Sequence, residues 1–175
     1  SARLLAAHNR ERARVGVAPL RWDPMLAGAA ASYGPTLARL GDLRHSSKAA
    51  RQGQLENLWM GTRGAFSPVQ MVGNWISERA YYRHGTFPDV SRTGRWSDVA
   101  HYTQVTWRGT THVGGATQPS RLFDFLNCRY SPPGNVTRTA RSVGLRRAAA
   151  TAAAQAAEPQ ALVSPAPRSQ VRITM

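Results

Sequence analysis

The chain has 175 residues, enough for one well-buried domain with an appendage, because single cores commonly span about 100 to 150 residues. Its 23 Lys and Arg against 9 Asp and Glu give a formal net charge of +14, and almost every basic residue is arginine. This charge favours anionic partners such as lipid headgroups, cell-envelope polymers or nucleic acid, but it does not specify a fold. No run of about 18 apolar residues occurs, so no membrane-spanning helix is expected.

Cysteine content gives no information about the compartment. Cys128 is the single cysteine, so no disulfide can form within the chain. The sequence begins at Ser1 without a secretory leader, which we interpret as a mature or trimmed chain.

The first helix is expected over residues 2–15, where apolar side chains recur at helical spacing until Gly16. His8 and Asn9 lie on or beside this apolar stripe. We expect them to orient the helix through hydrogen bonds.

A second helix is expected from Pro24 to Leu40. Asp23 before a proline has the form of an N-cap followed by a first-turn proline, and a glycine supplies the end at Gly41. Pro35 lies inside the run and is expected to kink the helix or to split it.

A third helix is expected to begin at Ser67, because Ser67 and Gln70 have the spacing of a capping box. Trp75 and Glu78 flank its apolar stripe. Glu78 is therefore expected near the edge of the core.

Three strand-like runs follow, at residues 101–107, 112–116 and 121–129. They alternate side chains and are rich in β-branched and aromatic residues, with glycine or proline between them. We predict an antiparallel meander. Residues 81–99 form a long connection without a sustained period, which is typical of a functional or mobile loop. The Pro-Pro-Gly within 130–136 predicts an extended loop.

Glu56 precedes Leu58 and Trp59, so it is expected at the edge of a buried patch. Desolvation there raises the pKa of a carboxylate unless a cation or a hydrogen-bond donor is near. By itself Glu56 is more often a solvated charge or a hydrogen-bond anchor, and a lone His101 is more often a hydrogen-bonded strand-end histidine than a functional one.

Together these segments resemble a known family. His-Tyr-Thr-Gln-Val-Thr-Trp at 101–107 and Tyr-Ser-Pro-Pro-Gly-Asn-Val at 130–136 are similar to the two signature motifs of the CAP superfamily, or SCP domain. This group comprises the cysteine-rich secretory proteins, antigen 5 and the pathogenesis-related class 1 proteins. Shorter matches occur in the family's order, and they are His8-Asn9 with Arg12, Pro19 to Asp23, His45-Ser46, Glu56-Asn57-Leu58, and Trp75 with Glu78. The resemblance covers residues 1–136 and implies an α+β fold, a three-layer α-β-α sandwich around an antiparallel sheet.

The resemblance also implies a site. In this family two histidines and two glutamates face each other across a cleft, and the matching positions are His45, Glu56, Glu78 and His101. Two imidazoles, His45 and His101, would hold a weak and exchangeable Zn²⁺, because a structural zinc site needs four ligands. Without metal, the four side chains would form a hydrogen-bonded polar cluster.

One departure from the family concerns its core disulfide. Gly115 stands where many relatives have a cysteine that pairs with one near Cys128. The chain therefore resembles the disulfide-free, bacterial type, and Cys128 is expected to be a small buried hydrophobic residue.

Two functions remain open from the sequence. The first is a secreted, extracellular or periplasmic binding protein for a lipid, sterol or cell-envelope ligand. The second is a metal-assisted hydrolase in which Glu56 or Glu78 acts as general base, although no nucleophile motif occurs and Ser46 and Ser47 do not make a triad. Nucleic-acid binding is a weaker alternative, because no reading module is recognised. A monomer is expected.

Residues 137–175 form a separate basic segment. It contains six arginines, one glutamate, many alanines and no aromatic residue, so we expect it to be disordered. It is either a neutral extension or an anchor to anionic surfaces.

Overall fold

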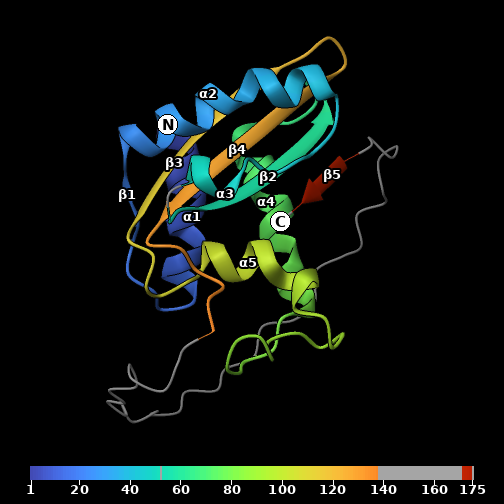
Figure 1. Ribbon diagram of the computed structural model, residues 1–175. Coiled ribbons are helices and arrows are strands. Elements are labelled where there is room, and N and C mark those ends of the chain that lie inside the picture. The colour runs from blue at the N-terminus through green and yellow to red at the C-terminus, as the bar shows by residue number, and fades with distance from the viewer. Residues whose placement is uncertain (52, 138–170, 175) are drawn as a thin grey trace. The chain divides into compact units, whose positions relative to one another are not determined.

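Five strands form one sheet at the centre of the fold. The computed structural model describes residues 1–51, 53–137 and 171–174 (Figure 1). The strand order is β1-β3-β4-β2-β5, and the strands are β1 (Arg21–Trp22), β2 (Leu55–Thr62), β3 (His112–Pro119), β4 (Phe123–Ser131) and β5 (Val171–Thr174). All neighbouring strands are antiparallel except β1 and β3, which are parallel.

Helices cover both faces of this sheet, so the predicted three-layer α-β-α sandwich is confirmed (Figure 1). The α-helices are α1 (Ala2–Arg14), α2 (Pro24–Leu40), α3 (Lys48–Arg51), α4 (Pro68–Ser77) and α5 (Ala100–Val105), and two short 3₁₀ helices span Glu78–Tyr81 and Trp96–Val99. α2 lies on one face, and α1, α4 and α5 lie on the other. Within the described residues, no helix is long and apolar enough to cross a bilayer.

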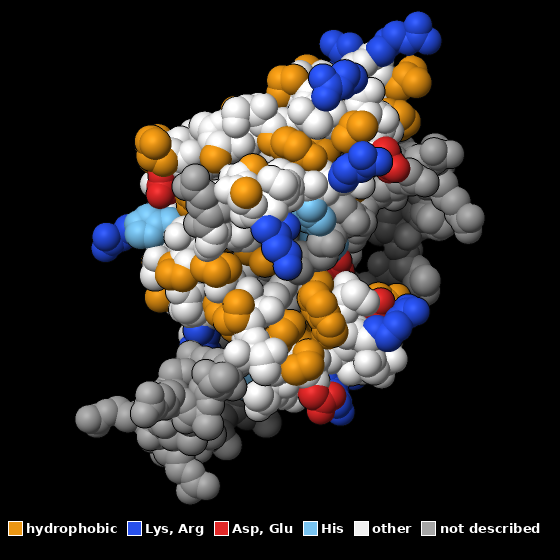
Figure 2. All heavy atoms as spheres, in the orientation of Figure 1, with side chains coloured by type: hydrophobic (Ala, Val, Ile, Leu, Met, Phe, Trp, Pro, Cys, Tyr) orange, Lys and Arg blue, Asp and Glu red, His pale blue; other side chains and the backbone are white. Residues whose placement is uncertain are grey.

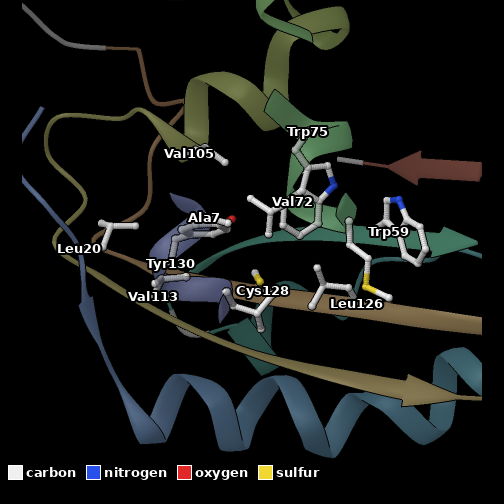
Figure 3. Packing of buried hydrophobic residues seen from close by; sticks show 12 residues of the cluster. Ala7, Leu20, Trp59, Val72, Trp75, Val105, Val113, Leu126, Cys128 and Tyr130 are labelled. Carbon is white, nitrogen blue, oxygen red and sulfur yellow. The ribbon is translucent and has the colours of Figure 1, made fainter. Parts of the chain in front are cut away.

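Alternation along the strands divides the core into two apolar clusters. On the face of α1 and α4, Leu126, Cys128 and Tyr130 of β4 pack with Trp59 of β2 and with Trp75 of α4 (Figure 3). On the face of α2, a second cluster contains Leu37, Leu58, Met60 and Phe125. Successive side chains of a strand point to opposite faces, so the neighbours Phe125 and Leu126 of β4 belong to different clusters.

The predicted helix starts are confirmed. Asp23 accepts hydrogen bonds from the N–H groups of Met25 and Leu26 at the start of α2. Ser67 and Gln70 form the capping box of α4. α2 is not split at Pro35 and continues to Gly41, whose φ of 64° ends it in the left-handed region.

The predicted strand at residues 101–107 is wrong, because this segment forms α5. All six residues of α5 are buried, so its alternation does not mark one exposed face. Tertiary contacts therefore override the β propensity of its residues. Of the predicted meander, only the hairpin of β3 and β4 remains, and β2 is a strand that the sequence pattern did not reveal.

The basic segment is described in part. Val171–Thr174 form β5 and pair with residues 58–61 of β2, which differs from the expectation of disorder. Residues 138–170 and 175 lie outside the described residues, so the expectation for them stays a prediction.

Cys128 is buried in the first cluster, as expected. Gly115 of β3 lies directly opposite it. A Cβ atom added at Gly115 would lie 2.6 Å from the Cys128 sulfur, so these two positions adjoin as a disulfide requires. Burial raises the pKa of the Cys128 thiol well above its usual range, which agrees with an unreactive core residue.

Arg12 joins α1 to the chain that follows α5. Its buried guanidinium donates to four backbone carbonyl oxygens, those of Ala18, Val105, Trp107 and Thr110, at 2.7–3.0 Å. Burial lowers the pKa of Arg12 to about 10. The planar group therefore stays charged and satisfies four carbonyls, those of Val105 and Thr110 in buried bonds.

We expect Arg12→Met to lower the free energy of unfolding by about 3 kcal/mol or more, because it leaves buried carbonyls without donors. Arg10→Met on the exposed side of the same helix is the matched control and should change stability little. Urea unfolding measures both. Equal effects of the two substitutions would contradict the bridging role of Arg12.

Candidate functional site

His45 and Glu56 form the first of two histidine–glutamate pairs. His45 lies between α2 and α3, and Glu56 is the second residue of β2. The His45 Nδ1 is 2.7 Å from Glu56 Oε1, which also accepts a hydrogen bond from the Ser46 N–H. Ser46 Oγ and Asn127 Nδ2 donate to Oε2, and the Nε of Arg129 lies 2.9 Å from Oε2 as an ion pair.

These partners keep the buried Glu56 ionised. Burial raises the pKa of its carboxyl, but the hydrogen bond from His45 and the charge of Arg129 outweigh burial, so the net shift is downward. Arg129 is thus the nearby cation that reverses the desolvation effect. A carboxylate with a lowered pKa is a poor general base near neutral pH.

Glu78 and His101 form the second pair. Glu78 follows α4, and its Oε1 lies 2.5 Å from the His101 Nδ1. Its Oε2 accepts the backbone N–H groups of His101 and Tyr102, so the carboxylate also caps the first turn of α5. The His101 ring stacks on Trp75, with 2° between the ring planes.

Each histidine leaves one ring nitrogen free. The carboxylates accept at Nδ1, so Nδ1 carries the proton and Nε2 carries a lone pair. The Nε2 atoms of His45 and His101 are both buried and have no hydrogen-bond partner in the described structure. A histidine held by a carboxylate through one nitrogen and open at the other is the usual arrangement of a metal ligand, so each of the two imidazoles fits the role of a metal ligand.

Neighbouring residues of β2 connect to the two pairs. The Glu56 side chain points to the face of α2. The next side chain, Asn57, points to the other face, and its Nδ2 donates to the His101 carbonyl oxygen at 3.4 Å. Both positions precede residues 58–61, where β5 pairs. In the described part of the chain, no three His, Cys, Asp or Glu side chains gather as metal ligands. The structure brings the four predicted residues together as two pairs, and their convergence on one open cleft stays a prediction.

A buried hydrogen-bond chain supports the second pair. His8 Nδ1 donates to the Leu4 carbonyl, so its Nε2 accepts from the Tyr130 hydroxyl at 2.8 Å. That hydroxyl in turn accepts from Asn57 Nδ2. Asn9 binds both backbone groups of Leu20. The expected orienting role of His8 and Asn9 is therefore confirmed.

The two signature segments contact each other directly. Gln104 of α5 accepts from the Gly134 N–H, and Thr103 donates to the Asn135 side chain. A Cβ atom at Gly134 would lie 2.7 Å from the Trp107 ring, so only glycine permits this approach. The loop at 130–136 thus fixes α5, and with it the position of His101.

The sequence did not reveal the role of three polar residues of the site. They are Asn127, Arg129 and Asn57, the last as a buried hydrogen-bond partner. All three are buried within strands. The signal was present, because an arginine or asparagine at an inward position of an apolar strand needs a buried partner.

Burial lowers the pKa of His8 to about 4, which predicts a pH dependence of stability. The unfolded chain takes up a proton near pH 6.5 and the folded chain only near pH 4, so stability falls as the pH drops between these values. From pH 7.5 to 5.0 we expect wild type to lose about 2 kcal/mol more than His8→Gln. Urea unfolding at both pH values checks this, with His84→Gln at an exposed histidine as control. Equal losses in wild type and His8→Gln would contradict it.

Comparisons with known proteins agree with this structure. Residues 5–130 match the model of the CAP family, described as the cysteine-rich secretory protein family. The chain is 39% identical over 134 residues to pathogenesis-related protein 1C of Nicotiana tabacum, covering 75% of this chain and 74% of that protein. It is 35% identical to pathogenesis-related protein 1 of Arabidopsis thaliana, covering 74% of each chain.

Solved structures show the same fold. NaASP2, crystallised with Zn²⁺, matches with a TM-score of 0.64 at 22% identity and covers 78% of this chain and 80% of its own. BmVAL-1 matches with a TM-score of 0.61 at 20% identity, covering 79% and 81%. The family match over most of the chain, together with the plant relatives, shows that this protein belongs to the CAP family and is similar to the pathogenesis-related class 1 proteins.

Proposed function

We propose that this protein is a secreted, extracellular binding protein that takes up a lipid, sterol or cell-envelope ligand and holds a weak, exchangeable Zn²⁺ through His45 and His101. One observation carries the metal part, namely the two buried Nε2 atoms without partners, each on a ring whose Nδ1 is held by a carboxylate. NaASP2, which shares the fold, has been crystallised with Zn²⁺, and this supports zinc binding by the present protein. The ligand class rests on the family membership.

In this proposal the protein's residues position the metal ligands. Glu56 and Glu78 fix the tautomer and the orientation of the two rings, and Trp75 holds the plane of His101. A bound zinc ion would supply a Lewis acid for an oxygen of the ligand. Two protein ligands leave the remaining positions to water or ligand, which makes the metal exchangeable.

A metal-assisted hydrolase is the second candidate, with Glu56 or Glu78 as general base. The contacts favour binding over hydrolysis, because both carboxylates already have several donors and Glu78 caps α5. Ser46 donates to Glu56 and accepts from Arg129, so its hydroxyl is not paired with an imidazole. A candidate serine nucleophile needs such a base within hydrogen-bond reach.

Zinc binding should require both histidines and should weaken on acidification, because only a neutral imidazole binds a metal ion. We expect titration calorimetry with zinc to show weak binding at pH 7.5 that is lost in His45→Ala and in His101→Ala. His84→Ala, at an exposed histidine outside the site, is the control. Tight binding that survives His101→Ala would place the metal elsewhere.

Ligand uptake should depend on the same region. We expect extracted lipids or envelope fragments to bind wild type and to bind the His45→Ala/His101→Ala double variant less well. Mass spectrometry of protein-bound material, with thermal melts to confirm folding, measures this. If a folded double variant captures as much ligand as wild type, the binding site does not include the two pairs. Metal-dependent hydrolysis of a captured ester or peptide would favour the hydrolase.

A further inference from the structure

A basic segment lies directly beside the first histidine–glutamate pair. Residues 44–51 contain Arg44, Lys48 and Arg51, and Lys48 and Arg51 are one turn apart on α3, so they share a face. Among the described residues, no carboxylate lies within ion-pair distance of any of the three. Lys and Arg side chains are also spread widely over the face drawn in Figure 2, several of them beside carboxylates.

Arg51 is held in an unfavourable place for a cation. Its Nε is buried and has no acceptor among the described atoms. Its charge also acts on Arg129. Burial lowers the pKa of Arg129, Glu56 opposes this shift, and the positive charge of Arg51 adds to it. A buried donor without a partner and a like charge nearby both oppose folding.

The charges of three arginines act on one hydroxyl group. Tyr33 of α2 donates to the Arg44 carbonyl oxygen at 2.9 Å. Burial and Glu56 raise the pKa of Tyr33, and the charges of Arg44, Arg129 and Arg51 oppose this shift. All three guanidinium charges are therefore near the Tyr33 hydroxyl.

Glu56, the carboxylate of the first pair, is already engaged. Glu56 binds His45, Ser46, Asn127 and Arg129, so it forms no ion pair with Arg44, Lys48 or Arg51 among the described contacts. An anion with several acceptor oxygens would satisfy the Arg51 Nε and separate the like charges. A phosphate group has this shape and charge, and it matches the planar fork of arginine.

We infer that Arg44, Lys48 and Arg51 form a binding site for a phosphate group at the rim of the first pair, next to His45. The site takes a phosphate ester, either the headgroup of an anionic lipid or a soluble phosphate. This inference goes beyond the proposed function, because it requires neither a bound metal ion nor an apolar ligand. Its failure would leave zinc binding untouched.

The test is a titration with inorganic phosphate, followed by the arginine Nε–H resonances in nitrogen-15 NMR spectra at constant ionic strength. We expect the Arg51 resonance to shift and saturate with phosphate but not with chloride. Arg51→Gln should weaken binding, read from the Ser46 and Ser47 amides, about tenfold or more. Arg121→Gln, which removes the same charge from the exposed turn at the opposite end of the sheet, is the matched control.

The absence of a saturable shift in wild type, or equal effects of Arg51→Gln and Arg121→Gln, would overturn the inference. Thermal melts establish that both variants fold. A second arm identifies the source of the phosphate. If Arg51→Gln weakens binding to phosphatidic acid vesicles in phosphatidylcholine more than Arg121→Gln does, the site serves a lipid headgroup, and equal weakening there assigns it to a soluble phosphate ester.

Discussion

The arrangement of this domain depends on one buried cation. Arg12 reaches from α1 to carbonyl oxygens on both sides of the turn that follows α5, and no carboxylate neutralises it there. A helix of six residues has little stability of its own. α5 therefore exists because Arg12 holds its C-terminal end, Glu78 caps its first turn, and the loop at 130–136 binds Thr103 and Gln104.

This construction explains how the site is built. His101 is the second residue of α5, so every contact that fixes the helix also fixes the imidazole. Glu78 serves both purposes, because one oxygen caps the helix and the other orients the ring. The stability of the domain and the geometry of the candidate metal ligands are thus coupled through the same carboxylate.

The two histidine–glutamate pairs differ in their electrostatic surroundings. Glu56 is neutralised by Arg129 and lies beside further arginines, so the first pair has an excess of positive charge around it. Glu78 is compensated instead by the N–H groups at the start of α5.

The sequence by itself determined the features whose partners are close along the chain. The caps at Asp23 and Ser67 bind N–H groups two or three residues away, and the β3–β4 hairpin joins neighbouring segments. The family motifs also identified His45, Glu56, Glu78 and His101, and the family itself. Only the tertiary structure decided the conformation of residues 101–107, because their partners are distant: Glu78 and Asn135 lie 23 and 32 residues away, and Arg12 lies 93 to 95 residues away. The same reason hid Asn127 and Arg129, which meet Glu56 only when β4 pairs with β2. Local hydrogen bonds can be recognised in the order of residues, whereas buried polar contacts between distant segments exist only after the layers have packed.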